Sequence, residues 1–495
     1  MLRQPVVAVV GHVDHGKSTL LDYIRKTNVA EKEAGGITQR LGAYEAVHKT
    51  AEGVMRRISF IDTPGHEAFG SCRACATGGA DVAILAVASD EGVKPQTVES
   101  VKILTAYKIP FVVALTKTDK PNTDLERAKQ SLAEKEIFVE GYGGAIPFAP
   151  VSAKTGAGIS ELLDLVLLLA DMNAKPCDSI KLAEGLVLES ERSAAKGIFA
   201  TLVVREGALR KGLSLVAGKS LSTMRLAEDY AGKPLVSIGC GQIARVGGWS
   251  EPPVPGESFR AYENKKDAER AITEASAAQN TPKKILEKKD ETERVVIPLI
   301  VKADTAGSIA AIKHEADKIG NDKIAVSIVS AGQGDVGEGD LRLAGSIGGS
   351  LVIGFNVGLD AGAKNATRAT GGAVVHIFDI IYRLAEFLEE TARARTPKEK
   401  REEVSAQARI VKIFSEEKGA QVVGGKVLEG TLETGDEFQI VRRGVRIGTG
   451  KIKELQKFKE RVREAAVGAE FGARAAYTFP LAQGDTIEVV KIIEV

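Results

Sequence analysis

The stretch 6-VVAVVGHVDHGKST-19 decides how the first third of this chain folds. Five apolar residues lead directly into a Gly-x-x-x-x-Gly-Lys-Ser segment that runs from Gly11 to Ser18. A buried strand that ends in such a loop, with a helix behind it, surrounds phosphates with backbone N–H groups and a helix N-terminus. Lys17 would reach the β- and γ-phosphates, and the Ser18 hydroxyl would bind Mg²⁺. The stretch predicts a phosphate-binding loop (P-loop) in an α/β domain.

The surrounding sequence supports this prediction. Short apolar runs alternate with helical patterns at 58-ISFI-61, 82-VAILAVA-88, 111-FVVAL-115 and 148-FAPVS-152. Continuous Val/Ile/Leu runs are typical of strands that are buried on both faces. We therefore expect a parallel sheet flanked by helices.

Two segments place polar groups beside the P-loop. Asp62 ends a strand and begins the segment DTPGH, in which Gly65 offers a backbone N–H to a γ-phosphate and His66 follows directly. A carboxylate at this place can hold Mg²⁺. The loop 34-AGGITQRLGAY-44 offers the Thr38 hydroxyl, and downstream of a P-loop it predicts a switch that orders around the metal and the γ-phosphate.

A third segment predicts which base is bound. In 116-TKTD-119, Asp119 can accept two hydrogen bonds from the N1–H and 2-amino edge that guanine has and adenine lacks. A carboxylate facing adenine would be desolvated without a donor, which is costly. Lys117 can lie along the base, and the Ala153 N–H in 152-SAK-154 can meet guanine O6. The predicted ligand is a guanine nucleotide.

Length, composition and cysteine content limit the classes of protein to which this chain can belong. The chain has 495 residues, 44% of them hydrophobic and 27% charged, which predicts several globular domains. No apolar run is long enough for a membrane span. Four Cys make a disulfide framework improbable and favour a reducing, cytoplasmic compartment. Cys72 and Cys75 form an isolated C-x-x-C that we attribute to helix packing, and Cys177 and Cys240 stand alone in the sequence.

The pattern predicts a multidomain fold of α/β domains and β-barrels. The expected parts are a P-loop GTPase domain at 1–174, a β-barrel at 175–262, a charged linker at 263–293, an α/β/α domain at 294–378, a connecting helix at 379–404 and a C-terminal β-barrel at 405–495. The segments 207-GALRKGL-213 and 430-GTLETGD-436 share Gly-x-Leu-x-x-Gly. Two barrels with similar turns would explain the match, and so would coincidence.

A basic patch lies in the last of these parts. Residues 442–463 contain nine Lys or Arg and two Glu, in a chain whose net charge is only +1. A solvated face with a few ion pairs explains such a run, and so does a surface for RNA backbone. The sequence leaves both interpretations open.

The motifs together resemble bacterial translation initiation factor two, a family of translational GTPases. The resemblance rests on GHVDHGKST, GGITQRLGAY, FIDTPGHEAF and DEGVKPQT in the first domain. It continues through 299-LIVKADTAGS-308, 352-VIGFNV-357, 380-IIYRL-384 and 455-LQKFKERV-462. It implies a GTP-binding, Mg²⁺-dependent cytoplasmic monomer that hydrolyses GTP on the ribosome. The implied partners are both ribosomal subunits, the GTPase centre of the large subunit and formylmethionyl initiator tRNA, which the last barrel would recognise. The implied role is initiator tRNA binding and subunit joining.

The resemblance also implies roles for single residues. His66 would act on the attacking water, with Lys17, Thr38 and Gly65 as the other catalytic groups, and Val13 and Ile37 would form an apolar gate beside His66. The expected metal ligands are Ser18, Thr38 and Asp62. The expected nucleotide contacts are Gly11, His12, Val13, Asp14, His15, Gly16, Lys17, Ser18, Thr19, Asp62, Thr63, Pro64, Gly65, His66, Thr116, Lys117, Thr118, Asp119, Ser152, Ala153 and Lys154.

Three features depart from the family pattern. Thr116 replaces an Asn whose main role is to tether neighbouring loops, so we expect weaker GTP affinity with unchanged base identity. Phe471 and Arg474 replace a Cys and a Gly near the expected formylmethionine pocket, which a bulky Phe would fill or reshape. The P-loop begins at residue 11, without the long N-terminal extension common in the family.

Two other functions fit parts of the sequence. An elongator-type tRNA carrier is disfavoured by GGITQ and by the second α/β domain. A GTP-gated RNA-binding scaffold without hydrolysis is disfavoured by the intact set of Lys17, Ser18, Asp62 and His66.

Overall fold

The computed structural model describes residues 3–26, 37–174, 177–193, 196–278, 295–320, 324–370, 375–396, 400–417, 419–458 and 460–494. The chain divides into two compact units, Met1–Arg395 and Thr396–Val495, and each is described by itself. Within the described residues, no helix has the length and apolar character needed to cross a membrane. Residues 34–36 of the expected switch loop, residues 175–176 at the start of the expected first barrel and residues 279–293 of the expected charged linker lie outside the described residues.

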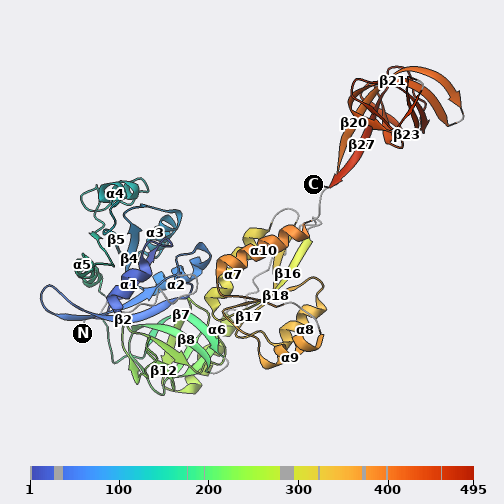
Figure 1. Cartoon of the computed structure of the whole chain (residues 1–495). Helices are drawn as coiled ribbons and strands as arrows, with labels where there is room; N and C mark the ends of the chain where they lie inside the picture. The colour runs from blue at the N-terminus through green and yellow to red at the C-terminus, as the bar shows by residue number, and fades with distance from the viewer. Residues whose placement is uncertain are drawn as a thin grey trace. The chain divides into compact units, whose positions relative to one another are not determined.

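The first unit begins with a six-stranded sheet in the order β2-β3-β1-β4-β5-β6 (Figure 1). Neighbouring strands are parallel except β2 and β3, which are antiparallel. The strands are β1 (Val6–Gly11), β2 (Gly42–Lys49), β3 (Met55–Asp62), β4 (Val82–Ala88), β5 (Phe111–Thr116) and β6 (Phe148–Pro150). The helices are α1 (Lys17–Arg25), the 3-10 turn η3 (Glu67–Phe69), α2 (Gly70–Gly79), α3 (Pro95–Tyr107), α4 (Leu125–Ala133) and α5 (Ile159–Met172).

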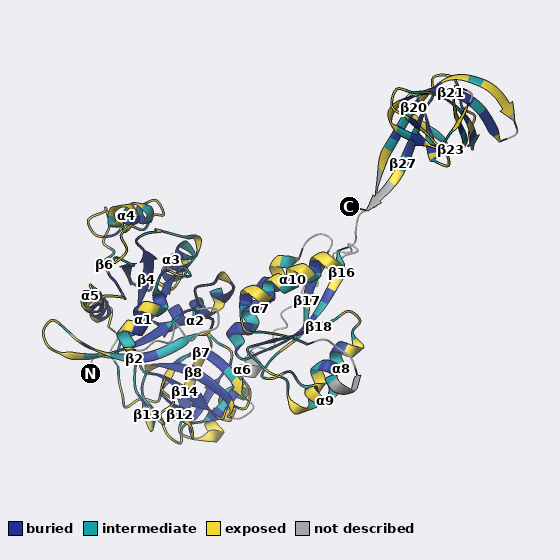
Figure 2. Cartoon of the chain, in the orientation of Figure 1, coloured by how far each residue is buried: buried dark blue, intermediate teal, exposed yellow. Residues whose placement is uncertain are grey.

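Every residue of β1 and β4 is buried, as expected for central strands covered by helices on both faces (Figure 2). The α/β fold class is confirmed. One strand was not predicted: β2 begins within the expected switch loop and forms the edge of the sheet. Most of its residues are only partly buried, and the strand includes Glu45, His48 and Lys49, so it has no continuous apolar run.

A second group of strands follows α5. Seven of them form a sheet in the order β11-β10-β15-β7-β8-β14-β12, and β9 pairs with β13. The sheet curls around an apolar core that includes Leu202, Trp249 and Phe259. The strands are β7 (Glu184–Ser193), β8 (Gly197–Glu206), β9 (Leu209–Arg210), β10 (Ser214–Ala217), β11 (Ser220–Thr223), β12 (Ala227–Glu228), β13 (Ser237–Ile238), β14 (Ile243–Gly247) and β15 (Ser258–Tyr262).

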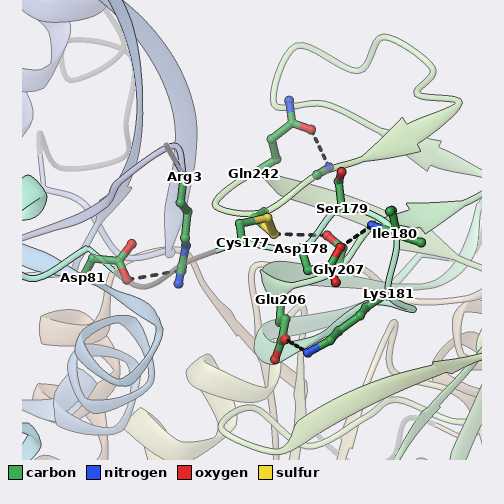
Figure 3. Close-up of a disulfide and its surroundings, with 12 residues drawn as sticks. Arg3, Asp81, Cys177, Asp178, Ser179, Ile180, Lys181, Glu206, Gly207 and Gln242 are labelled. Carbon is green, nitrogen blue, oxygen red and sulfur yellow. Dashed lines mark hydrogen bonds and ion pairs between the residues drawn. A yellow bond between two sulfur atoms is a disulfide. The ribbon is translucent and has the colours of Figure 1, made fainter. Parts of the chain in front are cut away.

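The expectation that Cys177 and Cys240 stand alone is wrong. The structure joins them by a disulfide that spans 63 residues of sequence, with Cα atoms 6.3 Å apart (Figure 3). Cys177 lies in the connection from α5, and Cys240 lies in the loop between β13 and β14. Spacing in the sequence does not reveal such a pair, because the fold alone brings the two segments together. Cys72 and Cys75 are free thiols on α2, which fits a packing role for the C-x-x-C.

The first unit ends with a four-stranded parallel sheet in the order β17-β16-β18-β19. Its strands are β16 (Val295–Ala303), β17 (Ile324–Gln333), β18 (Leu351–Phe355) and β19 (Val375–Phe378). The helices of this region are α6 (Lys265–Ala278), α7 (Ala306–Ile319), α8 (Glu338–Ser346), α9 (Ala361–Thr370) and α10 (Ile381–Arg395). Ile381, Leu384 and Leu388 on α10 belong to the same core as Ile353 of β18.

The second unit is a closed barrel. Its strands pair in the order β20-β27-β22-β23-β26-β21, and an additional pairing of β20 with β21 closes the ring. The strands are β20 (Lys400–Glu417), β21 (Ala420–Glu433), β22 (Glu437–Arg442), β23 (Val445–Lys457), β24 (Glu460–Val462), β25 (Glu464–Ala466), β26 (Glu470–Tyr477) and β27 (Thr486–Glu494).

The Gly-x-Leu-x-x-Gly repeat marks equivalent turns in the two β-rich parts. Gly207 and Gly430 both have positive φ (76° and 68°), and a Cβ at either position would lie 2.3 Å or closer to a backbone oxygen. Leu209 and Leu432 are both fully buried. Both segments therefore need glycine where two backbones touch and leucine in the core, which explains the shared pattern.

Candidate nucleotide-binding site

The predicted site residues gather at the carboxyl ends of the strands of the first sheet. They line a pocket of about 330 Å³. Its lining includes Val13, Asp14, Gly16, Lys17, Ser18, Thr19, Ile37, Thr38, Gly65, His66, Thr116, Lys117, Asp119, Ala153 and Lys154. P-loop, switch and base-binding segments that are far apart in sequence thus share one cavity.

Three of the other predicted residues, Gly11, His15 and Thr63, lie in the structure that supports the P-loop. His15 and Thr63 are fully buried, and the Thr63 hydroxyl donates to Val9 O at 2.7 Å. Gly11 has φ 143°, and a Cβ there would lie 2.5 Å from Ala86 O. Gly11 therefore lets the P-loop strand pass close to its neighbour, and these residues shape the loop from behind.

Lys17 is a buried cation in the wall of the pocket. Its side chain is buried, and Nζ donates to His12 O at 2.6 Å within the P-loop itself. Burial lowers the pKa of Lys17 to about 8, because the ammonium is desolvated, although the nearby Asp62 opposes this shift. A polyphosphate in the pocket would add negative charge beside this desolvated cation.

The three predicted metal ligands meet beside Lys17. The hydroxyl oxygens of Ser18 and Thr38 are 2.6 Å apart, and Ser18 Oγ donates to Asp62 Oδ2 at 3.5 Å. All the donor atoms are oxygens, the ligand type that Mg²⁺ prefers. The residues present therefore fit a magnesium ion that would also contact the phosphates.

At the base-binding end of the pocket, a hydrogen bond from Thr116 joins two loops. Thr116 Oγ1 donates to His15 O at 2.7 Å, which links the base-binding segment to the P-loop. Ser152 Oγ donates to Asp119 Oδ1 at 2.7 Å, and this hydrogen bond is the main reason that the pKa of Asp119 is lowered. Asp119 is therefore held as a carboxylate, the form that accepts hydrogen bonds from guanine.

His66 follows the strand end that contains Asp62 and begins η3. Its Nδ1 accepts a hydrogen bond from the Ala68 N–H at 3.0 Å, so a neutral ring has its proton on Nε2. Burial lowers the pKa of His66, with Glu315 opposing the shift, so the ring is neutral near pH 7. The imidazole also packs edge-on against Tyr382 of α10.

Three residues beside the switches had no predicted role. Gln39 donates through Nε2 to Asp379 O at 2.9 Å and accepts from the Ile381 N–H at 3.0 Å, which binds the first switch to the start of α10. Tyr382 contacts His66, and Arg73 of α2 lies behind the second switch. The sequence held one signal, an arginine in the otherwise small and apolar segment SCRACA.

The C-terminal unit has a groove of its own, of about 680 Å³. Gly424 of β21 pairs with Gly472 of β26, and both lie on the groove, as do the exposed rings of Phe414 and Phe458. Because glycine adds no side chain, the groove reaches the sheet backbone. Lys412, Lys426, Glu454, Glu470 and Arg474 supply charged groups to its lining.

Phe471, which was expected to fill or reshape the formylmethionine pocket, contributes to the wall of this groove from below. Residues alternate along β26, so the Phe471 side chain turns into the barrel core, where it is 4% exposed. A Cβ on Gly425 would lie 2.7 Å from its ring, so a glycine on the neighbouring strand makes room for the phenylalanine. Phe471 thus lies beneath the groove, and its neighbour Gly472 leaves the groove open.

The basic patch is partly neutralised. Arg442 forms two 2.8 Å hydrogen bonds with the Asp485 carboxylate. Lys451 pairs with Glu437 at 3.0 Å, and Arg461 pairs with Glu454 at 3.4 Å. The ion-pair interpretation holds for these three residues, and Arg443, Lys453 and Lys457 are exposed.

Comparisons with known proteins agree with this geometry. Residues 3–171 match the family model of the elongation factor Tu GTP binding domain. Residues 182–261 match elongation factor G domain 2. Residues 271–389 match translation-initiation factor 2. These three matches, together with the pocket at the P-loop, identify a translational GTPase.

A curated relative narrows the assignment. The chain is 37% identical over 502 residues to translation initiation factor IF-2 of Campylobacter lari, a match that covers 99% of this chain and 57% of the relative. The chain belongs to the translation initiation factor IF-2 family. It spans a little over half the length of that relative.

Two solved structures are also similar. GDP-bound aIF5B from Aeropyrum pernix is 25% identical with a TM-score of 0.47, over 99% of this chain and 92% of that one. A bacterial selenocysteine-specific elongation factor, EF-Sec, is 24% identical with a TM-score of 0.42, over 52% and 45%. The family assignment does not rest on either likeness.

Proposed function

We propose that this chain is a translation initiation factor that hydrolyses GTP when the ribosome stimulates it, and that it promotes binding of formylmethionyl initiator tRNA and joining of the ribosomal subunits. The observation on which this rests is one pocket lined by the P-loop, Thr38, His66 and the guanine-selective Asp119. The proposal places the chain in the cytoplasm as a monomer, with both ribosomal subunits as partners. It keeps the predicted domain boundaries at residues 174, 262, 293 and 378. The boundary predicted at residue 404 moves toward the N-terminus, because α10 ends at Arg395 and strand β20 of the barrel begins at Lys400.

Each residue of the site has a role in this proposal, and the hydrogen bonds around Ser18 support the metal site. Lys17 neutralises the β- and γ-phosphates, while Ser18, Thr38 and Asp62 would hold Mg²⁺. A bound Mg²⁺ would neutralise charge on the β- and γ-phosphate oxygens. Gly65 offers its N–H to the γ-phosphate, and His66 orients the attacking water once its ring leaves Tyr382. Hydrolysis is then slow in the free protein and fast when a partner reorients His66.

The groove of the C-terminal unit is the proposed site for the formylmethionyl end. Phe414 and Phe458 offer apolar faces to the methionine side chain, and aromatic rings make favourable contacts with a thioether sulfur. The Phe414 ring lies over Gly424, whereas the space over Gly472 is open, so the uncharged formyl-amide can approach the backbone at Gly472. Lys412 and Lys426 attract the phosphates of the adjoining nucleotides.

The test compares binding of the chain to one initiator tRNA charged either with formylmethionine or with methionine. The proposal expects tighter binding of the formylated form. The lining has three cationic and two anionic side chains, and Glu454 already pairs with Arg461, so an α-ammonium would lose hydration there beside an excess of positive charge. Gly472→Val should reduce binding of both forms, since a branched side chain would occupy the floor of the groove. The control Gly345→Val alters an exposed glycine of α8 with open space around it and should leave binding unchanged. Equal binding of both forms by the unaltered chain would refute the proposed tRNA selectivity.

GTP hydrolysis in the presence of ribosomes distinguishes the proposed initiation factor from a GTP-gated scaffold. A scaffold would bind GTP and RNA without releasing phosphate when ribosomes are added. The proposed factor would release phosphate in proportion to the ribosomes added, and this result would exclude the scaffold.

A further inference from the structure

Arg73 is a fully buried cation behind the second switch. Its side chain is 1% exposed and lies in α2, a helix that otherwise consists of small residues. A buried guanidinium is costly unless carboxylates or carbonyl oxygens surround it. The partners of Arg73 therefore indicate what this residue does.

Those partners are mostly backbone oxygens of the switch. Arg73 Nη1 donates to Pro64 O at 3.1 Å and to His66 O at 2.6 Å. Arg73 Nη2 donates to Glu99 Oε1 at 2.6 Å and, at 3.4 Å, to Glu67 O. One planar guanidinium thus holds the carbonyl groups on both sides of Gly65.

This arrangement sets the direction of the Gly65 N–H. In a trans peptide the C=O and the N–H point in opposite directions. Because Pro64 O is turned toward Arg73, the Gly65 N–H of the same peptide is turned to the opposite side. Gly65 itself lies against the P-loop, where a Cβ would be 2.7 Å from Lys17 Nζ and 3.0 Å from Val13 Cα.

Helix α3 contacts both Arg73 and the P-loop. Its Glu99 pairs with Arg73, and its Gln96 accepts the Val13 N–H at 3.1 Å through Oε1. One helix therefore braces both the buried arginine and the P-loop residue that Gly65 touches. A change at Arg73 is expected to affect the distance and orientation between Gly65 and the P-loop.

We propose that Arg73 is a positioning residue that aims the Gly65 N–H at the γ-phosphate, so that the chain's discrimination between GTP and GDP depends on it. The inference rests on the proposed function, because it assumes that Gly65 contacts the γ-phosphate. If Arg73 acts through Gly65, its loss weakens the binding of GTP more than that of GDP, because only GTP has a γ-phosphate. Loss of a residue that only packs would weaken both equally.

The test measures the dissociation constants of a non-hydrolysable GTP analogue and of GDP, both with Mg²⁺, for the full chain and its variants. For Arg73→Gln we expect the ratio of the two constants to shift about tenfold against the GTP analogue, with GDP affinity changed by no more than about twofold. Arg73→Lys keeps the charge without the planar fork and should shift the ratio less. Glu99→Gln should shift it in the same direction. The control Arg127→Gln alters an exposed arginine of α4 and should leave the ratio unchanged.

An unchanged ratio, or an equal loss of affinity for both nucleotides, would overturn the inference and leave Arg73 a packing residue. If Arg73→Gln does not fold, Arg73→Lys and Glu99→Gln decide the question by the same ratio. Failure of the unaltered chain to bind guanine nucleotides would instead refute the proposed function. The two failures are therefore distinguishable.

Discussion

The imidazole of His66 packs edge-on against the phenol ring of Tyr382, with ring centroids 4.6 Å apart and planes at 68°. His66 belongs to the second switch, and Tyr382 is the second residue of α10. Gln39 of the first switch binds the backbone at the start of the same helix. Both switches therefore contact the start of α10, so the conformation of the nucleotide site and the position of this helix depend on each other.

Removal of the Tyr382 ring should free the histidine. An aromatic pair stabilises by about 0.5–1.5 kcal/mol, so Tyr382→Ala should raise GTP hydrolysis without ribosomes by roughly 2- to 10-fold. Tyr382→Phe keeps the ring and should behave like the unaltered chain, as should Tyr230→Ala, which alters an exposed tyrosine elsewhere. Single-turnover phosphate release measures the effect, and an unchanged rate in Tyr382→Ala would show that the ring does not restrain His66.

Asp119→Asn should change the base that the pocket accepts. An amide donates where the carboxylate accepts, so it suits the 2-oxo group of xanthine and not the 2-amino group of guanine. Loss of hydrogen bonds to a charged acceptor should weaken GTP binding by roughly 100-fold and favour xanthosine triphosphate. Competition binding with the two nucleotides provides the test. Retained GTP preference would mean that Asp119 does not contact the base.

Glu189 should make the folded state sensitive to pH. It is 8% exposed, accepts the N–H groups of Ser190 and Gly307, and lies near Asp304 and Cys72. Burial raises its pKa from 4.5 to about 7, so between these values the folded chain retains a proton that the unfolded chain has lost. Its contribution to stability is present below pH 4.5 and disappears as pH rises to 7.

Glu189→Gln removes this titration and keeps the acceptor oxygen. Relative to the unaltered chain, the variant should gain on the order of 3 kcal/mol in free energy of unfolding between pH 5 and pH 8. Denaturant unfolding at the two pH values measures the gain, with Glu184→Gln on the exposed part of β7 as the control. If the variant and the unaltered chain differ in free energy of unfolding by the same amount at both pH values, Glu189 does not titrate in this range.

The Cys177–Cys240 disulfide should stabilise the β-rich part that it encloses. A link that closes 63 residues restricts the unfolded chain, and chain entropy predicts about 4 kcal/mol of stabilisation. Reduction, or Cys177→Ser with Cys240→Ser, should lower the free energy of unfolding by an amount approaching this value. Cys75→Ser, which alters a free thiol, is the control. Equal stability of oxidised and reduced chains would show that the link contributes nothing.

Much of the fold was predictable because its signals are local. The apolar runs of β1, β3, β4 and β5 and the glycines of the P-loop follow from short-range sequence, and so does the union of Lys17, Ser18 and Asp62 at one sheet edge. Strand β2 was missed because an edge strand is half exposed and lacks an apolar run. The disulfide and the contacts of Gln39 and Arg73 depend on segments distant in sequence, which no local pattern encodes.

The most direct test of the account is ribosome-stimulated GTP hydrolysis by the unaltered chain and by His66→Ala. The account predicts that ribosomes accelerate phosphate release by the unaltered chain, and that the variant binds GTP normally while losing roughly 100-fold or more of the stimulated rate. His48→Ala, at a histidine bonded to Asp164 away from the pocket, should retain stimulation. Undiminished stimulation in His66→Ala would contradict the role assigned to His66, and no stimulation of the unaltered chain would contradict the account itself.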